Sequence, residues 1–324
     1  MSNARYTNMG HARYIGRIGA LAVALGIGAG MFAMPFVASA KPSTPDTSSA
    51  TDSASTTSTA PSAKKPKVPV TVSVNGKIVR DTDPNDTTVA ITTPGEHSRA
   101  VARGVGSTAD ATNCNRCTAT VTGTGSTATA TNGSNNTATV TGDNSHATAT
   151  DGNHNTATVN GNNNIGAIAR LGDNNTAIIS GDNNIVALAG DGGDNNTATA
   201  DGSGVTASAG IGGHNNTVTV TGNNSSADIR VGDYNTATLT GNFSGAQSGF
   251  GDNNTATVTG DGSHAVAGGN DLSPGNGNTA TVVGDGSTAT AGPVDGNTAI
   301  VHGDGLSAAA TGDGTTVIVP PPAP

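Results

Sequence analysis

Aromatic side chains are almost absent from this chain, which has no tryptophan and only 2% aromatic residues among 324. Ordinary globular domains fill their interiors with large apolar side chains, so a domain with a thick core is excluded. Charged residues are also scarce, at 11%. Small residues are abundant instead, and glycine alone accounts for 47 positions. Any core must therefore be thin and built from small side chains.

Basic residues are nearly missing from residue 118 onward. That part has 16 Asp and no Glu against two Arg, a balance of −14, whereas residues 41–117 have nine Lys or Arg against seven acids. Nucleic-acid binding needs basic side chains for the phosphates and aromatic side chains for stacking on bases. Both are rare here, so nucleic-acid binding is disfavoured.

Cysteine occurs only twice, as Cys114 and Cys117. In an exported protein, a Cys-x-x-Cys pair beside a turn predicts a local disulfide. A thioredoxin-like redox site would need a βαβ context, which this sequence lacks. A zinc site would need two further ligands, and only His97 is near in sequence. We therefore expect a Cys114–Cys117 disulfide.

A short repeat dominates the chain from Thr118 to Ile318, and its plainest form is NTATVTGD at residues 136–143. Successive units are spaced by 19, 19, 20, 21, 20, 19, 19, 24 and 19 residues. A period near 20 with strand-like content predicts a solenoid in which each repeat is one turn, here called a rung. The units begin at Thr118, Thr137, Thr156, Thr176, Thr197, Thr217, Thr236, Thr255, Thr279 and Thr298.

Each unit alternates strictly between small apolar and polar residues, which predicts a strand with Ala138 and Val140 inward and the Thr residues outward. A turn and a second strand follow, with Ser145, Ala147 and Ala149 inward. The sequence thus predicts an all-β, two-sheet β-solenoid of about ten 19–20-residue rungs with a thin Ala/Val core. Matching inward triplets are expected at Ile165/Ala167/Ala169, Ile185/Ala187/Ala189 and Ser287/Ala289/Ala291.

An Asn precedes the first Thr in nine of the units. Stacking these residues predicts a column whose side-chain amides exchange hydrogen bonds from rung to rung. The column is Asn136, Asn155, Asn175, Asn196, Asn216, Asn235, Asn254, Asn278 and Asn297.

The N-terminal residues 1–40 have the composition of a signal peptide. A basic start with Arg5, Arg13 and Arg17 precedes an uncharged run, and Ala38-Ser39-Ala40 provides small residues for cleavage. The run RYIGRIGALAVALGIGAG at residues 13–30 resembles the leaders of exported mycobacterial proteins. Export to the outside of the cell or its surface is expected, with no membrane span after cleavage; an uncleaved anchor is the alternative.

Four further segments follow the leader. Residues 41–67 are rich in Ser, Thr, Pro and Lys and predict a disordered linker. Residues 68–117 predict an N-terminal cap and a degenerate first rung, with a hairpin turning at Asn75-Gly76 through a type I′ turn. Residues 118–319 hold the repeats, and the Pro-rich tail 320–324 should end strand pairing.

The outward threonines form the most regular candidate surface. Two columns of Thr, about 6.8 Å apart along a strand and about 4.8 Å apart between rungs, present methyl and hydroxyl groups in an array. The array resembles the ice-binding faces of insect β-solenoid antifreeze proteins, although Thr is also simply a good, soluble strand former. Its members are Thr118, Thr120, Thr137, Thr139, Thr156, Thr158, Thr197, Thr199, Thr217, Thr219, Thr236, Thr238, Thr255, Thr257, Thr279 and Thr281.

Recurring Gly-Asp turns, such as Gly142-Asp143 and Gly260-Asp261, align carboxylates that offer oxygen ligands for Ca²⁺. Calcium solenoids repeat every nine residues rather than 19–20, so turn formation explains these residues better and no cofactor is expected. The histidines are scattered singly, and carboxylates recur in columns rather than converging. We therefore expect no enzymatic activity.

The repeat Gly-x-Asn-x-Thr-Ala-x-Val also resembles the curlin repeats of bacterial fibres over roughly two thirds of the chain. Curlin repeats carry inward Gln columns and aromatic residues, whereas Gln247 is the only glutamine here. The sequence favours an exported, non-enzymatic structural or adhesive rod whose partners are cell-envelope polymers or other copies of itself. A curlin-like fibre subunit and an ice-binding protein are the alternatives.

Overall fold

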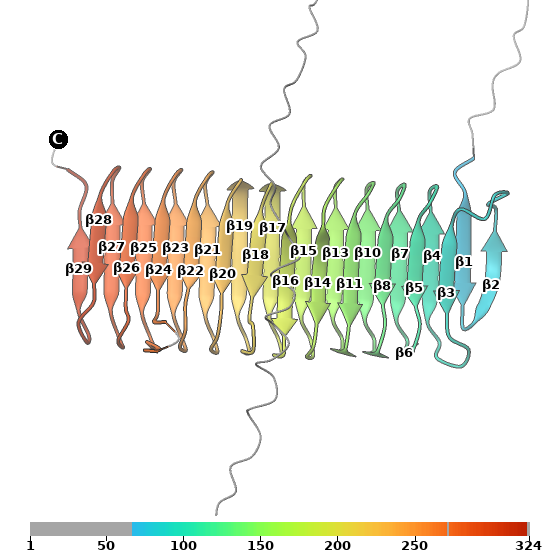
Figure 1. The fold of residues 1–324 in the computed structure, drawn as a ribbon, viewed down its shortest axis with the longest axis horizontal. Coiled ribbons are helices and arrows are strands. Elements are labelled where there is room, and N and C mark those ends of the chain that lie inside the picture. The colour runs from blue at the N-terminus through green and yellow to red at the C-terminus, as the bar shows by residue number, and fades with distance from the viewer. Residues whose placement is uncertain (1–66, 271, 323–324) are drawn as a thin grey trace, which may run out of the picture. The chain divides into compact units, whose positions relative to one another are not determined.

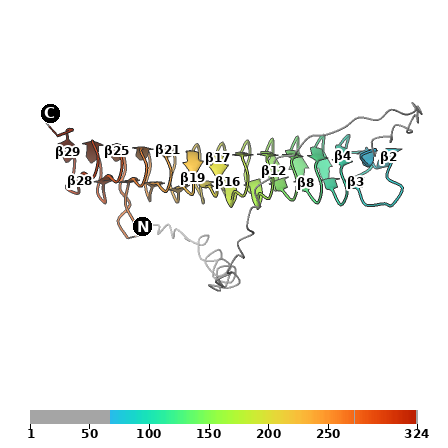
Figure 2. The same ribbon diagram turned by 90° about the horizontal axis from the view of Figure 1, so that it is seen from above.

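The computed structural model describes residues 67–270 and 272–322, and these form a β-solenoid of about 12 turns. The predicted signal peptide and nearly all of the predicted linker lie outside the described residues. Within the described part every regular element is a strand, and no helix there is long and apolar enough to cross a membrane. Figures 1 and 2 show the strands stacked side by side along the long axis in two facing layers.

The larger sheet has 14 strands, in the order β2-β1-β4-β7-β10-β13-β15-β17-β19-β21-β23-β25-β27-β29. Its strands are β1 (Val70–Val74), β2 (Lys77–Asp81), β4 (Arg99–Arg103), β7 (Thr118–Thr122), β10 (Thr137–Thr141), β13 (Thr156–Asn160), β15 (Thr176–Ser180), β17 (Thr197–Ser203), β19 (Thr217–Asn223), β21 (Thr236–Thr240), β23 (Thr255–Thr259), β25 (Thr279–Val283), β27 (Thr298–His302) and β29 (Thr316–Val319).

The smaller sheet has 12 strands and contains the second strand of each rung. Its strands are β3 (Val89–Thr92), β5 (Thr108–Ala111), β8 (Thr127–Ala130), β11 (His146–Thr150), β14 (Gly166–Arg170), β16 (Val186–Asp191), β18 (Thr206–Ala209), β20 (Ser226–Ile229), β22 (Gly245–Ser248), β24 (His264–Ala267), β26 (Thr288–Ala291) and β28 (Ser307–Ala310). A third sheet joins β6 (Cys114–Asn115), β9 (Gly133–Ser134) and β12 (Gly152–Asn153).

Equivalent residues of successive rungs stack directly on one another. In the parallel pair β10 and β13, Thr137 lies beside Thr156 and Ala138 beside Ala157. Ala138 and Val140 are fully buried, which confirms the predicted inward phase of the first strand. The core is a continuous row of Ala and Val side chains between the two sheets, as the composition requires.

The solenoid has more turns than the ten that the repeat spacing indicates. The additional rungs lie before Thr118, where β3 and β4 belong to the degenerate segment and β4 pairs in parallel with β7. They lack the Thr-Ala-Thr-Val pattern but keep its inward small residues, because Ala100 and Ala102 are fully buried. Burial of small side chains therefore defines a rung more generally than the outward threonines do.

The predicted N-terminal hairpin is confirmed. Strands β1 and β2 pair antiparallel, and β1 also pairs antiparallel with β4, which extends the larger sheet. Asn75 and Gly76 both have positive φ, of 50° and 79°, as a type I′ turn requires. At the opposite end β29 pairs in parallel with β27 before Pro320, as expected.

The second strand of two rungs differs from the prediction. Ile165 and Ile185 do not point inward, since 67% and 50% of their surfaces are exposed. Asn164 and Asn184 take the inward place instead, and the Asn184 N–H donates to the side-chain oxygen of Asn164 over 2.9 Å. These rungs have an additional residue before the strand, and an amide there satisfies backbone groups that an isoleucine would leave unpaired.

The Asn residues stack in a column as predicted, and they are buried, but their hydrogen bonds differ from those expected. The amides do not bond to each other: the side-chain oxygen of Asn155 accepts from the backbone N–H of Asn175 over 2.9 Å, and its NH₂ donates to the carbonyl of Gly172 over 2.8 Å. From Asn136 to Asn254, each amide thus bridges two backbone groups of the following rung. These hydrogen bonds connect neighbouring rungs at the turns from the smaller to the larger sheet, here called the second corner.

Candidate functional site

The predicted Thr array lies on the outer face of the larger sheet, on β7, β10, β13, β17, β19, β21, β23 and β25. All of its residues are half-buried except Thr217, which is exposed. Neighbouring rungs keep the columns in exact register, with Thr139 beside Thr158 and Thr238 beside Thr257. Ile178 and Ile300 interrupt the second column, because they pair with Thr158 and Thr281. The array is therefore regular but divided into blocks.

Cys114 and Cys117 form the predicted disulfide. Both side chains are buried, and Cys117 occupies the place that Asn holds in the following rungs, because the Asn136 N–H donates to its Sγ over 3.1 Å. The disulfide continues the column at the second corner. Its position is thus that of a structural link within the stack.

The turn carboxylates accept hydrogen bonds from the backbone of the preceding rung. Oδ1 of Asp143 accepts from the Thr124 N–H over 2.6 Å, and Oδ1 of Asp285 accepts from the Asp261 N–H over 2.8 Å. These turns connect the larger sheet to the smaller one and are called the first corner. No cluster of three or more His, Cys, Asp or Glu suited to a metal occurs in residues 67–270 and 272–322. At these turns the carboxylates act as acceptors for backbone N–H groups.

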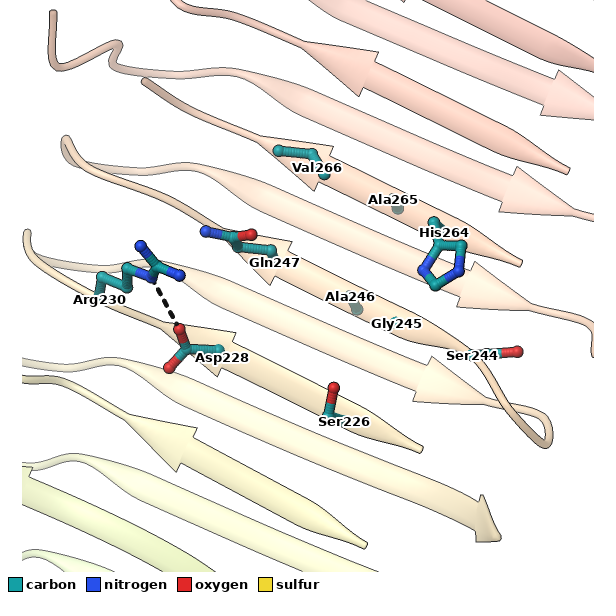
Figure 3. A pocket seen from close by; sticks show the side chains of 10 residues that line it. All are labelled: Ser226, Asp228, Arg230, Ser244, Gly245, Ala246, Gln247, His264, Ala265 and Val266. Carbon is teal, nitrogen blue, oxygen red and sulfur yellow. Dashed lines mark hydrogen bonds and ion pairs between the residues drawn. The ribbon is translucent and has the colours of Figure 1, made fainter. Parts of the chain in front are cut away.

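Sequence reasoning missed a hollow on the outer face of the smaller sheet. It has a volume of about 340 Å³ and lies over β20, β22 and β24 (Figure 3). Gly245 creates its floor, because it stands between Ser226 and His264 in the same outward column and has no side chain. A Cβ at Gly245 would lie 2.7 Å from Nδ1 of His264, so the imidazole extends over the glycine.

The other end of the hollow is charged. Nε of Arg230 donates to the Asp228 carboxylate over 3.1 Å, and both side chains are partly exposed. Figure 3 shows Gln247 on the neighbouring strand close to this pair, with Val266 beyond it and His264 at the opposite end of β24. Among the described residues, the side chains of Ser226, Gln247 and His264 make no hydrogen bonds. Their polar atoms are therefore free to meet a ligand.

No hydrogen bond joins the side chains of Ser226 and His264, the two residues at this end of the hollow that could act as nucleophile and base. They lie on strands that are separated by β22, about 10 Å apart between backbones at the usual strand spacing, and the imidazole extends back over Gly245. The arrangement offers hydrogen-bond donors and acceptors around a shallow floor. Its chemistry is that of a binding surface.

One sequence signal could have located this hollow. The repeat region is otherwise uniform, yet its only glutamine, its aromatic residues and one of its two arginines all fall between Arg230 and Phe250. The other rungs fold without these residue types, so their concentration in one segment marks a place where the sequence is under an additional constraint.

No protein-family model, curated protein or solved structure matches the chain.

Proposed function

We propose that this protein is an exported, non-enzymatic structural or adhesive β-solenoid of the cell envelope or the secreted fraction. The observation that carries the proposal is the continuity of the stack. Parallel pairing in register connects the strands of the larger sheet from β4 to β29, and two corner columns reinforce it. Such a body is a stiff, acidic rod with a uniform surface, which suits a spacer or an adhesive element.

The proposal of export rests on residues 1–40. The basic start, the uncharged run and Ala38-Ser39-Ala40 have the order and composition of a cleavable signal peptide. The disulfide between Cys114 and Cys117 is in keeping with an oxidising compartment. The partners that we propose for the exported chain are cell-envelope polymers or other copies of itself.

Cell fractionation combined with intact-mass measurement tests this proposal. We expect to find the protein in the envelope or the culture fluid, with the intact mass of a chain that begins at Lys41. Recovery from the cytosol with Met1 to Ala40 retained would contradict it. Digestion of intact cells with an added protease separates a surface location from one inside the envelope.

Two alternatives have specific support. The stacking of identical residues in register favours a curlin-like fibre subunit, whereas the single glutamine and the scarcity of aromatic residues disfavour it. The registered Thr columns favour ice binding, whereas Ile178 and Ile300 break the array. The rod remains the preferred proposal because it needs neither an unbroken plane of Thr residues, as ice binding does, nor an end of the stack that adds further strands, as a fibre does.

A further inference from the structure

We infer that the hollow over β20, β22 and β24 binds a neutral saccharide. The inference rests on the adhesive form of the proposed function and names the class of ligand that the rod would hold. The volume of about 340 Å³ lies at the lower end of the ~300–1,000 Å³ that small-molecule sites span. The hollow therefore matches one or two sugar rings rather than a large ligand.

The rim of the hollow has the mixed chemistry that sugar hydroxyls need. Each hydroxyl both donates and accepts, so its receptor should offer donors beside acceptors. Arg230 donates, Asp228 accepts, and the Gln247 amide does both within the same group of side chains (Figure 3). At the other end the Ser226 hydroxyl and the His264 imidazole, which extends over Gly245, offer a second donor and acceptor combination.

The floor suits the C–H face of a sugar ring. Strand backbone forms it, since Gly245 has no side chain and the side chains of Ala246 and Ala265 are buried in the core. Val266 adds a half-buried apolar side chain at one edge. A ring laid over this floor would keep its hydroxyls at the height of the rim, where the polar side chains lie.

A neutral ligand fits better than an anionic one. The positive charge of Arg230 is already matched by Asp228 over 3.1 Å, and the repeats carry 16 Asp against two Arg from residue 118 onward. A carboxylate or phosphate would meet this negative field and would have to compete with Asp228 for the guanidinium. A polyhydroxylated ligand can instead use the ion pair intact, with one group as donor and the other as acceptor.

The same sheet supplies matched controls for the test. Arg170 also faces outward on the smaller sheet and pairs with Asp191 over 3.4 Å, but it lies outside the hollow. Gly166 occupies the same column as Gly245, and a Cβ there would have its nearest neighbour at 3.7 Å. Gly166→Ala should therefore be tolerated, whereas Gly245→Ala displaces His264 and narrows the hollow.

Isothermal titration calorimetry of the full mature chain tests the inference, with cellotetraose, maltotetraose and N,N′,N″,N‴-tetraacetylchitotetraose as neutral probes and tetragalacturonic acid as the anionic probe. We expect at least one neutral probe to bind at one site per chain, and we expect this binding to persist at high salt. Arg230→Ala, Gln247→Ala and Gly245→Ala should each weaken it tenfold or more, whereas Arg170→Ala and Gly166→Ala should leave it unchanged.

Three results would overturn the inference: no binding of any neutral probe, equal losses in Arg230→Ala and Arg170→Ala, or binding of tetragalacturonic acid alone that disappears at high salt. Circular dichroism of each variant shows whether the strands remain folded, so a folding defect is recognised. Export of the protein is measured separately by fractionation. A failure to bind saccharide would therefore leave the proposed rod intact, and mislocalisation would leave the binding result intact.

Discussion

The side-chain oxygen of Asn136 accepts a 2.9 Å hydrogen bond from the backbone N–H of Asn155, one rung further along the stack. The NH₂ group of Asn136 donates to the carbonyl of Gly152 over 2.9 Å. Asn155 repeats the arrangement toward Asn175 and Gly172, so one residue type satisfies buried backbone groups at successive turns of the second corner. This relationship explains why the corner keeps Asn while the neighbouring turn positions vary.

Replacing one residue of this column should be costly. Asn155→Ala would leave the Asn175 N–H and the Gly172 carbonyl unpaired, and each buried unpaired group costs about 1–3 kcal/mol. We expect the free energy of unfolding to fall by about 2–6 kcal/mol in urea titrations. The matched control is Asn162→Ala at the exposed first corner, where water replaces the lost bond and the change should stay below about 1 kcal/mol. Equal effects would contradict this account of the column.

Inward alanines should tolerate no increase in volume. Ala147 is buried between Ala128 and Ala167, so Ala147→Leu should destabilise the protein by about 1–3 kcal/mol or more through overpacking. The adjacent Thr148 faces outward and is half-buried, so Thr148→Leu should cost little. Thermal unfolding of both variants measures the difference. Similar melting temperatures would mean that the core can expand and is not closely packed.

The N-terminal cap should weaken in acid. Burial acts to raise the pKa of Asp83, but hydrogen bonds from Thr87, the Asn85 N–H and Thr88 outweigh it and lower the pKa to about 2. A lowered folded-state pKa stabilises the fold above the ordinary value near 4, and this contribution is lost as the pH falls from about 4 to about 2. Proton exchange at the Thr88 amide, which donates to Asp83 over 2.5 Å, should therefore accelerate across this window relative to its intrinsic rate.

Two variants separate this effect from general acid unfolding. Asp83→Asn should remove most of the pH dependence at Thr88, whereas Asp86→Asn, in the same turn but exposed, should retain it. An unchanged pH profile in Asp83→Asn would show that another group controls the cap.

Much of the fold could be predicted from the amino-acid sequence. The inward phase of Ala138 and Val140, the hairpin turn at Asn75-Gly76 and the Cys114–Cys117 disulfide depend on local alternation, turn chemistry and spacing, which a single sequence contains. The prediction that Ile165 and Ile185 point inward is wrong, because it rests on their hydrophobicity alone. At the first corner, buried backbone groups need hydrogen-bond partners, and the side chains of Asn164 and Asn184 provide them.

The hollow could not be located from the repeat pattern. Its residues come from three rungs, and Ser226, Gln247 and His264 are spaced by about one repeat length, so local motifs do not connect them. Only parallel stacking brings them onto one face. The single glutamine is a visible signal in the sequence, but the hollow also depends on Gly245, over which the His264 imidazole extends.

We expect the Thr array to be a structural surface that does not bind ice. Ile178 and Ile300 interrupt it, and Asp201 adds charge at its margin, while an ice-binding plane should be continuous. We expect no thermal hysteresis from the wild-type protein. Replacing Thr139, Thr158, Thr219 and Thr238 with Lys should leave the fold largely intact, with weak repulsion between rungs. Clear hysteresis that those four substitutions abolish would make ice binding the leading function.

The central claim is that the protein is a discrete rod and not a fibre subunit. At one end β2 is a fully exposed strand with Lys77, Arg80 and Asp81, and such charges oppose pairing with another sheet edge. At the other end Pro320 follows β29 directly and cannot donate to a ladder. Both edges of the larger sheet therefore discourage further strand addition.

Electron microscopy of the purified mature protein after prolonged incubation tests this claim most directly. About 12 turns at ~4.8 Å give a stack about 58 Å long, so discrete particles of that length are expected at every time point and concentration. Unbranched fibres that lengthen with time, and that seed fresh protein, would contradict the rod and establish the curlin-like alternative.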